Sequence, residues 1–134
     1  MGKLVVVKVG TSSVTKSDGS LDLDAMRALT DQVAEAIRRG YQIILVTSGA
    51  IGSGIAELGI KPKPNDIVFK QACAAVGQAI LIEHYRQLFR RHGLKVAQVL
   101  LTKEDLANRV SYIHVCNVLD RLLSLNVVPI INEN

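Results

Sequence analysis

Short apolar runs alternate with longer amphipathic segments along the chain. The runs are rich in Val, Ile and Leu and stay apolar at successive positions, which is typical of parallel strands covered on both faces. Between them, apolar residues recur at three- and four-residue steps, and this period predicts helices with one buried stripe. The pattern predicts four strands, at residues 4–9, 41–46, 95–101 and 127–131.

Helix-capping residues bound four predicted helices between these strands. Side chains that cap helix N-termini stand at Asp22 or Asp24, at Asp66, and at Thr102 with Asp105. Residues that tolerate the left-handed conformation stand where the helices should end, at Gly40, Gly59, Gly93 and Asn126. Two residues run against the pattern. Gly77 lies in the middle of the longest helix, and Pro129 predicts that the last strand ends or bulges there.

The resulting order, βαβααβαβ, predicts an α/β fold. Strands that alternate with helices form a mainly parallel sheet with helices on both faces, so we expect a three-layer αβα sandwich. The 134 residues, of which 49% are hydrophobic and 21% charged, suffice for one domain core and exclude a disordered chain. The chain stops at residues 132–134, directly after a buried-looking strand, so we expect it to be a piece of a longer protein.

Composition narrows the class of partner. The apolar runs are shorter than the ~18–20 residues of a membrane helix, and the first of them, interrupted at Lys8, is too short for a signal peptide. We therefore expect a cytoplasmic protein without a membrane partner. The net charge is +4, which suits a phosphate-bearing substrate. Aromatic residues make up 4% and Trp is absent, so stacking platforms are scarce and we expect no nucleic-acid partner.

Candidate chemistry gathers where three strands end. Ligands of parallel α/β sheets bind beyond the carboxyl ends of the strands, which selects residues 8–12, 47–52 and 132–134. Taken alone, the glycine loop after the second strand is explained by a tight turn, and Lys8 by a solvated strand end. Together, a lysine and two glycine loops at one edge favour an oxyanion or phosphate site. The loops match neither the dinucleotide nor the P-loop fingerprint, and no metal-ligand spacing is present.

Four ordered motifs carry a family resemblance over the whole chain. They are residues 7–12 (VKVGTS), 46–52 (VTSGAIG), 70–78 (KQACAAVGQ) and 128–134 (VPIINEN). Together they resemble the glutamate 5-kinases of the amino acid kinase family. The resemblance implies the N-terminal, amino-acid-binding half of that fold, at residues 1–134. It also implies ATP-dependent phosphorylation of the L-glutamate side-chain carboxylate to L-glutamyl 5-phosphate, the first step of proline biosynthesis, with Mg²⁺ accompanying ATP.

The resemblance also implies residue roles. Lys8 would be the catalytic residue and would contact the ATP phosphates, in a loop shaped by Gly10 and Thr11. The glutamate side of the site would comprise Ser48, Gly49, Ala50 and Asn134. The long helix with Gln71 and Gln78 looks like the family's helix beside the substrate and dimer surfaces, so we expect a homo-oligomer. No metal ligand is implied in this segment.

The sequence departs from the family pattern at a few positions and leaves alternatives open. The family usually has an aspartate directly after the segment that matches Asn134, and this chain ends first. His114 and Val118 stand where an asparagine and a threonine are common. The alternatives are a sibling kinase acting on another carboxylate or carbamate, and a non-catalytic amino-acid-binding fragment. By itself, the 134-residue chain is expected to be inactive as a kinase.

Overall fold

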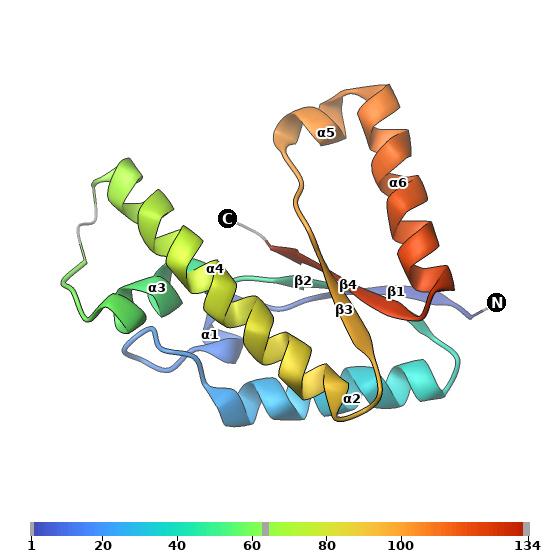
Figure 1. The fold of residues 1–134 in the computed structure, drawn as a ribbon, viewed down its shortest axis with the longest axis horizontal. Helices are drawn as coiled ribbons and strands as arrows, with labels where there is room; N and C mark the ends of the chain where they lie inside the picture. The colour runs from blue at the N-terminus through green and yellow to red at the C-terminus, as the bar shows by residue number, and fades with distance from the viewer. Residues whose placement is uncertain (1, 63–64, 133–134) are drawn as a thin grey trace.

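Four parallel strands form one sheet in the order β1-β2-β4-β3 (Figure 1). A computed structural model describes residues 2–62 and 65–132. The strands are β1 (Leu4–Lys8), β2 (Gln42–Thr47), β3 (Lys95–Val99) and β4 (Val127–Asn132). All three pairings are parallel, so the predicted parallel sheet is confirmed.

Helices cover both faces of the sheet, which confirms the three-layer arrangement. They are α1 (Thr11–Val14), α2 (Leu23–Arg38), α3 (Ala50–Leu58), α4 (Ile67–Arg90), α5 (Lys103–Ala107) and α6 (Arg109–Ser124). Helix α2 contacts α4 and β2 on one face, whereas α6 contacts β4 on the other (Figure 1). Among the described residues, no helix is both long enough and apolar enough to cross a membrane.

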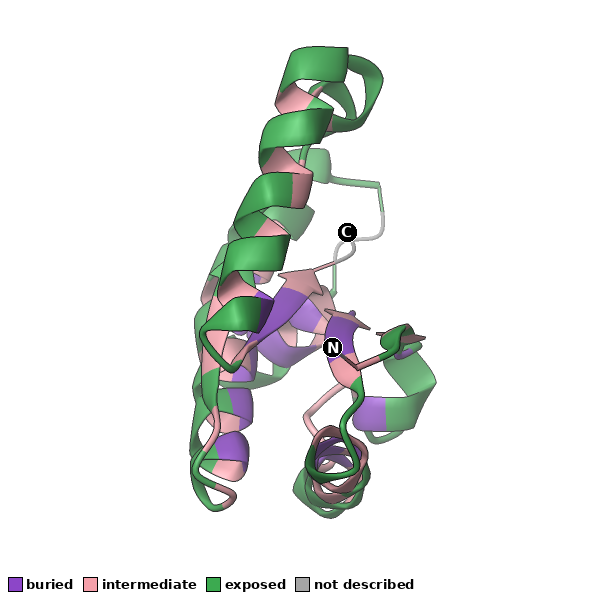
Figure 2. Ribbon diagram, turned by 90° about the vertical axis from the view of Figure 1, so that its right-hand side faces the viewer, coloured by how far each residue is buried: buried purple, intermediate pink, exposed green. Residues whose placement is uncertain are grey.

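The main core lies between the sheet and helices α2 and α4. Alternate residues of β2 and β4 face these helices and are almost fully buried, as at Leu45 and Ile130. Helix α4 contributes Tyr85 and Phe89, whose rings stack 6.4 Å apart. Figure 2 shows the buried residues gathered between the sheet and these helices, whereas α5 and most of α6 are exposed. The sheet is thus anchored mainly from the face that α2 and α4 cover.

The predicted caps form as expected from the sequence. Asp22 accepts from the amide of Ala25 at the start of α2. Asp66 does the same for α4, and both hydrogen bonds of the Thr102–Asp105 capping box are present. Asn126 has a φ of 58° in the turn that leads into β4. Local side-chain chemistry therefore sets these helix ends.

Two helical expectations need correction. The single helix predicted after β3 is two helices, because Asn108 has an extended backbone and its side chain accepts from the amides of Val110 and Ser111. This cap begins a new helix in the middle of the predicted one. In addition, Thr11–Val14 forms a short helix within the segment that the sequence predicts as a loop after the first strand.

Pro129 does not end or bulge the last strand. It lies within β4, an interior strand of the sheet, in register with Ala97 of β3. The ladder between β2 and β4 begins only at Ile130, the next residue. The proline therefore precedes the first residue pair of that ladder. Its lack of an amide hydrogen removes no hydrogen bond from the ladder between β2 and β4.

Gly77 permits a close helix crossing. An ideal Cβ at this position would lie 1.7 Å from the carbonyl oxygen of Ala50 in α3. On the facing side of the crossing, a Cβ on Gly54 would lie 1.8 Å from the carbonyl oxygen of Cys73 in α4. Only glycine fits at either position without moving backbone, so the mid-helix glycine fixes where α3 begins relative to α4.

Candidate functional site

The loops after β1 and β2 are tied together at the carboxyl edge of the sheet. The hydroxyl oxygens of Thr11 and Ser48 lie 2.9 Å apart and share a hydrogen bond. The Ser48 hydroxyl also donates to the carbonyl oxygen of Val9, at 3.2 Å. The two segments selected by the strand-end rule therefore meet, although 37 positions separate the bonded residues in sequence.

Lys8 occupies the last position of β1 and is exposed. It lies in register with Val46, two residues before Ser48 on the neighbouring strand. Gly10 and Thr11, which follow it, are also exposed. The edge therefore carries a lysine and hydroxyl groups on adjacent strand ends that solvent, and hence a dissolved anion, can reach.

Gly49 sets the direction in which α3 leaves the edge. Its φ of 103° is a left-handed conformation that L side chains rarely adopt, and it occupies the N-cap of α3. Ala50, the first helical residue, is buried against α4. Because glycine has no side chain to cap the helix, the first amides of α3 keep their donor capacity for an anion at its positive end.

A buried hydrogen bond anchors the end of β2. The Thr47 hydroxyl lies 2.8 Å from the hydroxyl of Tyr85 on α4. Both residues are fully buried. Burial raises the pKa of the Tyr85 hydroxyl above its ordinary value of 10.0, and the bond to Thr47 offsets part of that effect. The tyrosine is therefore neutral at physiological pH, and it fixes the residue that precedes Ser48.

A cavity of about 440 Å³ lies beside these loops. Helix α4 forms one wall, while Ile51 of α3 and Asn132 of β4 contribute from the strand-end side. Its polar wall residues on α4 include Lys70 and Gln78. Strand-end reasoning did not select this wall, because the residues belong to a helix face. Their spacing along the helix was the available signal, since residues about two turns apart share a face.

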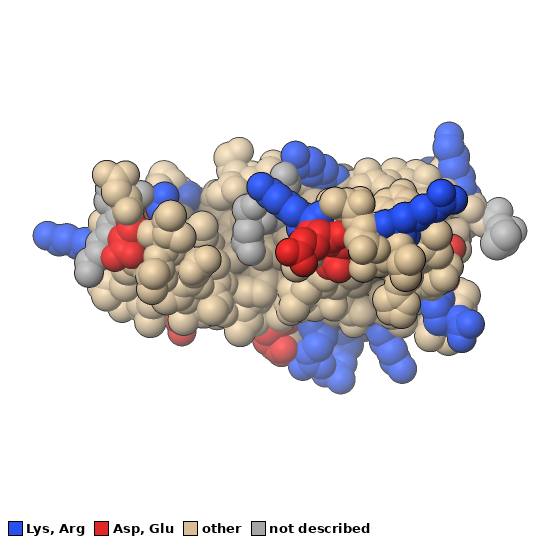
Figure 3. All heavy atoms as spheres, turned by 90° about the horizontal axis from the view of Figure 1, so that it is seen from above, with Lys and Arg blue, Asp and Glu red and all other residues tan. Residues whose placement is uncertain are grey.

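The other expected site residues have mixed outcomes. Asn134 lies outside the described residues. Thr102, at the end of the third strand, caps α5 as the sequence predicted. Among residues 2–62 and 65–132, no three His, Cys, Asp or Glu side chains gather as a possible metal-binding group. Figure 3 shows Lys and Arg side chains spread over one face of the molecule with acidic side chains between them.

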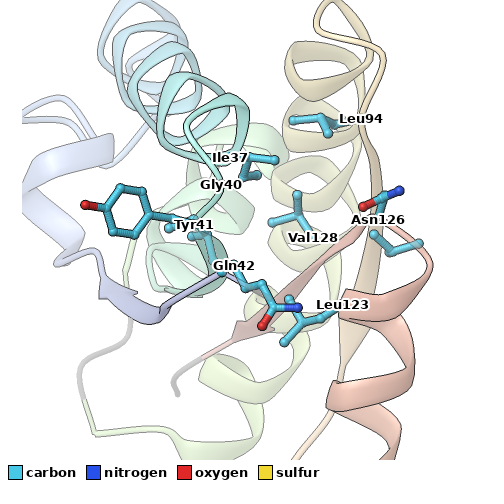
Figure 4. A pocket seen from close by; sticks show the side chains of 11 residues that line it. Ile37, Gly40, Tyr41, Gln42, Leu94, Leu123, Asn126 and Val128 are labelled. Atoms are coloured by element: carbon cyan, nitrogen blue, oxygen red, sulfur yellow. The ribbon is translucent and has the colours of Figure 1, made fainter.

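A second cavity, of about 230 Å³, lies at the opposite, amino edge of the sheet. Figure 4 shows Leu94, Leu123 and Val128 around it, with the carboxamides of Gln42 and Asn126. It opens between β2 and β4, where their ladder has not yet begun. The cavity thus follows from the late start of that ladder, and its walls mix apolar side chains with carboxamides.

Comparison with known proteins places the chain in a family. The profile of the amino acid kinase family matches residues 3–134. The glutamate 5-kinase of Thermoanaerobacter sp. (strain X514) is 51% identical over 97% of this chain and 35% of its own length. That of Symbiobacterium thermophilum is 48% identical over 98% of this chain and 50% of its own length. The chain thus spans between a third and a half of these curated relatives.

Solved structures agree at the level of the fold. A structure of Giardia carbamate kinase superimposes with a TM-score of 0.61 at 15% identity, over 98% of this chain and 60% of that one. At this identity the likeness establishes the architecture alone. Since the family profile spans almost every residue and the three-layer fold agrees with it, the chain belongs to the amino acid kinase family.

Proposed function

We propose that residues 1–134 form the N-terminal, amino-acid-binding part of a glutamate 5-kinase. The reaction is phosphorylation of the side-chain carboxylate of L-glutamate by ATP, which gives L-glutamyl 5-phosphate for proline biosynthesis. Curated relatives named glutamate 5-kinase, 47% to 52% identical over nearly the whole chain, support this assignment.

The hydrogen bond between Thr11 and Ser48 is the observation that carries the proposal. It joins the lysine-bearing loop, proposed for the phosphates, to the glycine loop proposed for glutamate. A carboxylate oxygen attacks the γ-phosphorus of ATP, a new O–P bond forms, and ADP leaves with the electrons of the broken P–O bond. Lys8 stabilises charge on the transferring group, which is the main demand of phosphoryl transfer.

The remaining roles follow the same division of the edge. Gly10 and Thr11 shape the phosphate loop, whereas Ser48, Gly49 and Ala50 face glutamate. Asn134 is proposed as a further glutamate contact from the family resemblance. Mg²⁺ is proposed to arrive on the ATP phosphates, where it neutralises charge. The resemblance also supports a homo-oligomer in the cytoplasm, without a nucleic-acid or membrane partner for this segment.

The test is acyl-phosphate formation by the protein expressed from its own coding sequence. Hydroxylamine traps acyl phosphates as hydroxamates, so it separates carboxylate phosphorylation from ATP hydrolysis. We expect ADP release and hydroxamate in equal amounts with L-glutamate, and little of either with L-aspartate or carbamate. A preference for aspartate or carbamate would establish a sibling kinase. ADP release without hydroxamate from any of these substrates would overturn the assignment.

A further inference from the structure

Two polar side chains of the 440 Å³ cavity have no role in the phosphate contacts proposed above. Lys70 and Gln78 lie about two turns apart on α4 and so share one helix face. The same cavity is lined by Ile51, three residues after Ser48, and by Asn132, which is in register with Thr47. The two side chains therefore border a cavity whose wall includes Ile51, the residue that follows the proposed glutamate loop in sequence.

Within the part of the chain that the structure describes, the carboxamide of Gln78 makes one hydrogen bond and leaves its oxygen without a donor. Its Nε2 donates to Oε1 of Gln98 at 2.6 Å. Its own Oε1 is buried and accepts no hydrogen bond from the described residues. A buried carbonyl oxygen that accepts no hydrogen bond lowers the stability of the folded protein. This oxygen is therefore suited to a ligand that carries a hydrogen-bond donor.

Lys70 brings a positive charge to the same cavity, where it can attract an anionic group of a ligand. Its side chain is exposed and brings an ammonium group to the cavity wall. The apolar side chains of Ile51, Ile67 and Leu100 line the same cavity. One acceptor and one cation, set in mainly apolar walls, complement a molecule that carries an ammonium donor and a carboxylate together.

We propose that Gln78 and Lys70 bind the amino-acid end of the substrate, Gln78 through the α-ammonium and Lys70 through the α-carboxylate. This assignment rests on the proposed function, because it leaves the side-chain carboxylate to reach the Ser48 loop and the phosphates. Gln78 and Lys70 are then specificity residues for an α-amino acid, distinct from the strand-end residues that serve the phosphoryl transfer.

Two substrate analogues test the two contacts separately. Glutarate lacks the α-ammonium and 4-aminobutyrate lacks the α-carboxylate, while both keep the carboxylate that would be phosphorylated. In Gln78→Leu, the ratio of kcat/KM for glutamate to that for glutarate should fall about 10- to 100-fold, the range for a hydrogen bond to a charged group. The kcat/KM for glutarate itself should stay unchanged. In Lys70→Met, the preference for glutamate over 4-aminobutyrate should fall up to about 5-fold, because the cation is exposed.

Matched variants on the same segment provide the controls. Gln87→Leu changes an exposed α4 glutamine that donates to Glu83, and Lys61→Met changes an exposed lysine in the loop before α4. Both should keep the wild-type preferences. Gln78→Glu keeps an oxygen acceptor and should retain the preference for glutamate over glutarate, which a purely structural role of the carboxamide would not explain.

The outcomes separate this subsite from the proposed function. If the wild-type protein forms no hydroxamate from glutamate, the proposed function fails and the subsite fails with it. If it does, and Gln78→Leu keeps its preference over glutarate, the function stands and the subsite is wrong. Should Gln78→Leu lose its structure by circular dichroism, Lys70→Met at the exposed rim decides: an unchanged preference over 4-aminobutyrate overturns the proposal.

Discussion

The two edges of the sheet differ in chemistry although each borders a cavity. At the carboxyl edge, Lys8 and the bonded hydroxyls of Thr11 and Ser48 lie beside a cavity with a lysine and two glutamines in its wall. At the amino edge, the described residues that line the cavity in Figure 4 include two carboxamides and a tyrosine but no charged side chain. A cavity alone therefore does not identify the functional site. The hydrogen-bond donors and charged side chains beside the cavity identify it.

Strand direction explains the difference. In a parallel sheet, every strand ends at the same edge, and the helix that follows β2 begins there with its positive end. Gly49 opens α3 at that edge without a side chain in the way. At the amino edge, chains arrive from helix C-termini through turns such as those at Gly40 and Asn126. The N-terminus of α3 therefore lies at the carboxyl edge, whereas the helices before β2, β3 and β4 end at the amino edge.

The largest expected effect is on catalysis at the carboxyl edge. Replacing Lys8 by alanine should lower kcat about 10²- to 10³-fold, as for the loss of one transition-state donor, with a smaller effect on glutamate binding. Lys3 lies before the other end of β1 and is also exposed. Lys3→Ala should leave kcat unchanged in the same steady-state assay. Equal losses in both variants would break the contrast between the edges.

Gly77→Ala should have the next largest effect, on stability and on the site together. The added Cβ meets the carbonyl of Ala50, so α3 must move, at a cost of ~3 kcal/mol in the free energy of unfolding. Denaturant unfolding measures this cost. Ala79→Gly, at an exposed position of the same helix, should cost only about 1 kcal/mol. A Gly77→Ala protein as stable as the wild type would refute the close crossing.

Leu123→Ala tests whether the amino edge contributes to stability without contributing to catalysis. Leu123 is buried at the cavity of Figure 4, so truncation should lower the free energy of unfolding by about 2 kcal/mol. The values of kcat and of KM for glutamate should not change, because the residue lies at the amino edge, away from Lys8 and the Thr11–Ser48 pair. A selective rise in KM for glutamate would show that the amino edge contributes to substrate binding.

Asp31→Asn should have the smallest effect, and one that depends on pH. A hydrogen bond from His92, aided by the charge of Arg91, lowers the pKa of the Asp31 carboxyl below its ordinary value of 3.8. This contribution to stability is complete above that ordinary value and is lost as pH falls through the lower pKa of the folded state. The wild-type advantage in Tm should therefore be present at pH 6 and shrink toward pH 3. An advantage that is constant with pH would contradict this origin.

Most of the fold could be predicted because its signals are local. The caps at Asp66 and Thr102 and the left-handed turn at Asn126 depend on neighbours within a few residues. The break at Asn108 was missed because the apolar period continues through it while a side chain caps a new helix. Pro129 was misjudged because its cost depends on where the ladder of another strand begins.

The candidate site divides in the same way. Lys8 and the Ser48–Gly49–Ala50 loop were found from sequence, since strand ends and glycines can be located without a fold. The Lys70 and Gln78 wall could not be found from strand ends, because a helix face gains meaning only from what it packs beside; only the family resemblance pointed to this helix and to Gln78. Their relevance required the positions of β3 and β4.

The sequence by itself determined the elements, their order, the parallel sheet and the edge that carries the candidate chemistry. These follow from periodicity, capping and strand direction, which act over short stretches of chain. Only the tertiary structure decided which groups touch: the Thr11–Ser48 bond, the Gly77–Ala50 crossing and the hydrogen bond from the Gln78 carboxamide to Gln98. Each joins segments far apart in sequence, and such contacts depend on the packing of the whole domain rather than on any local pattern.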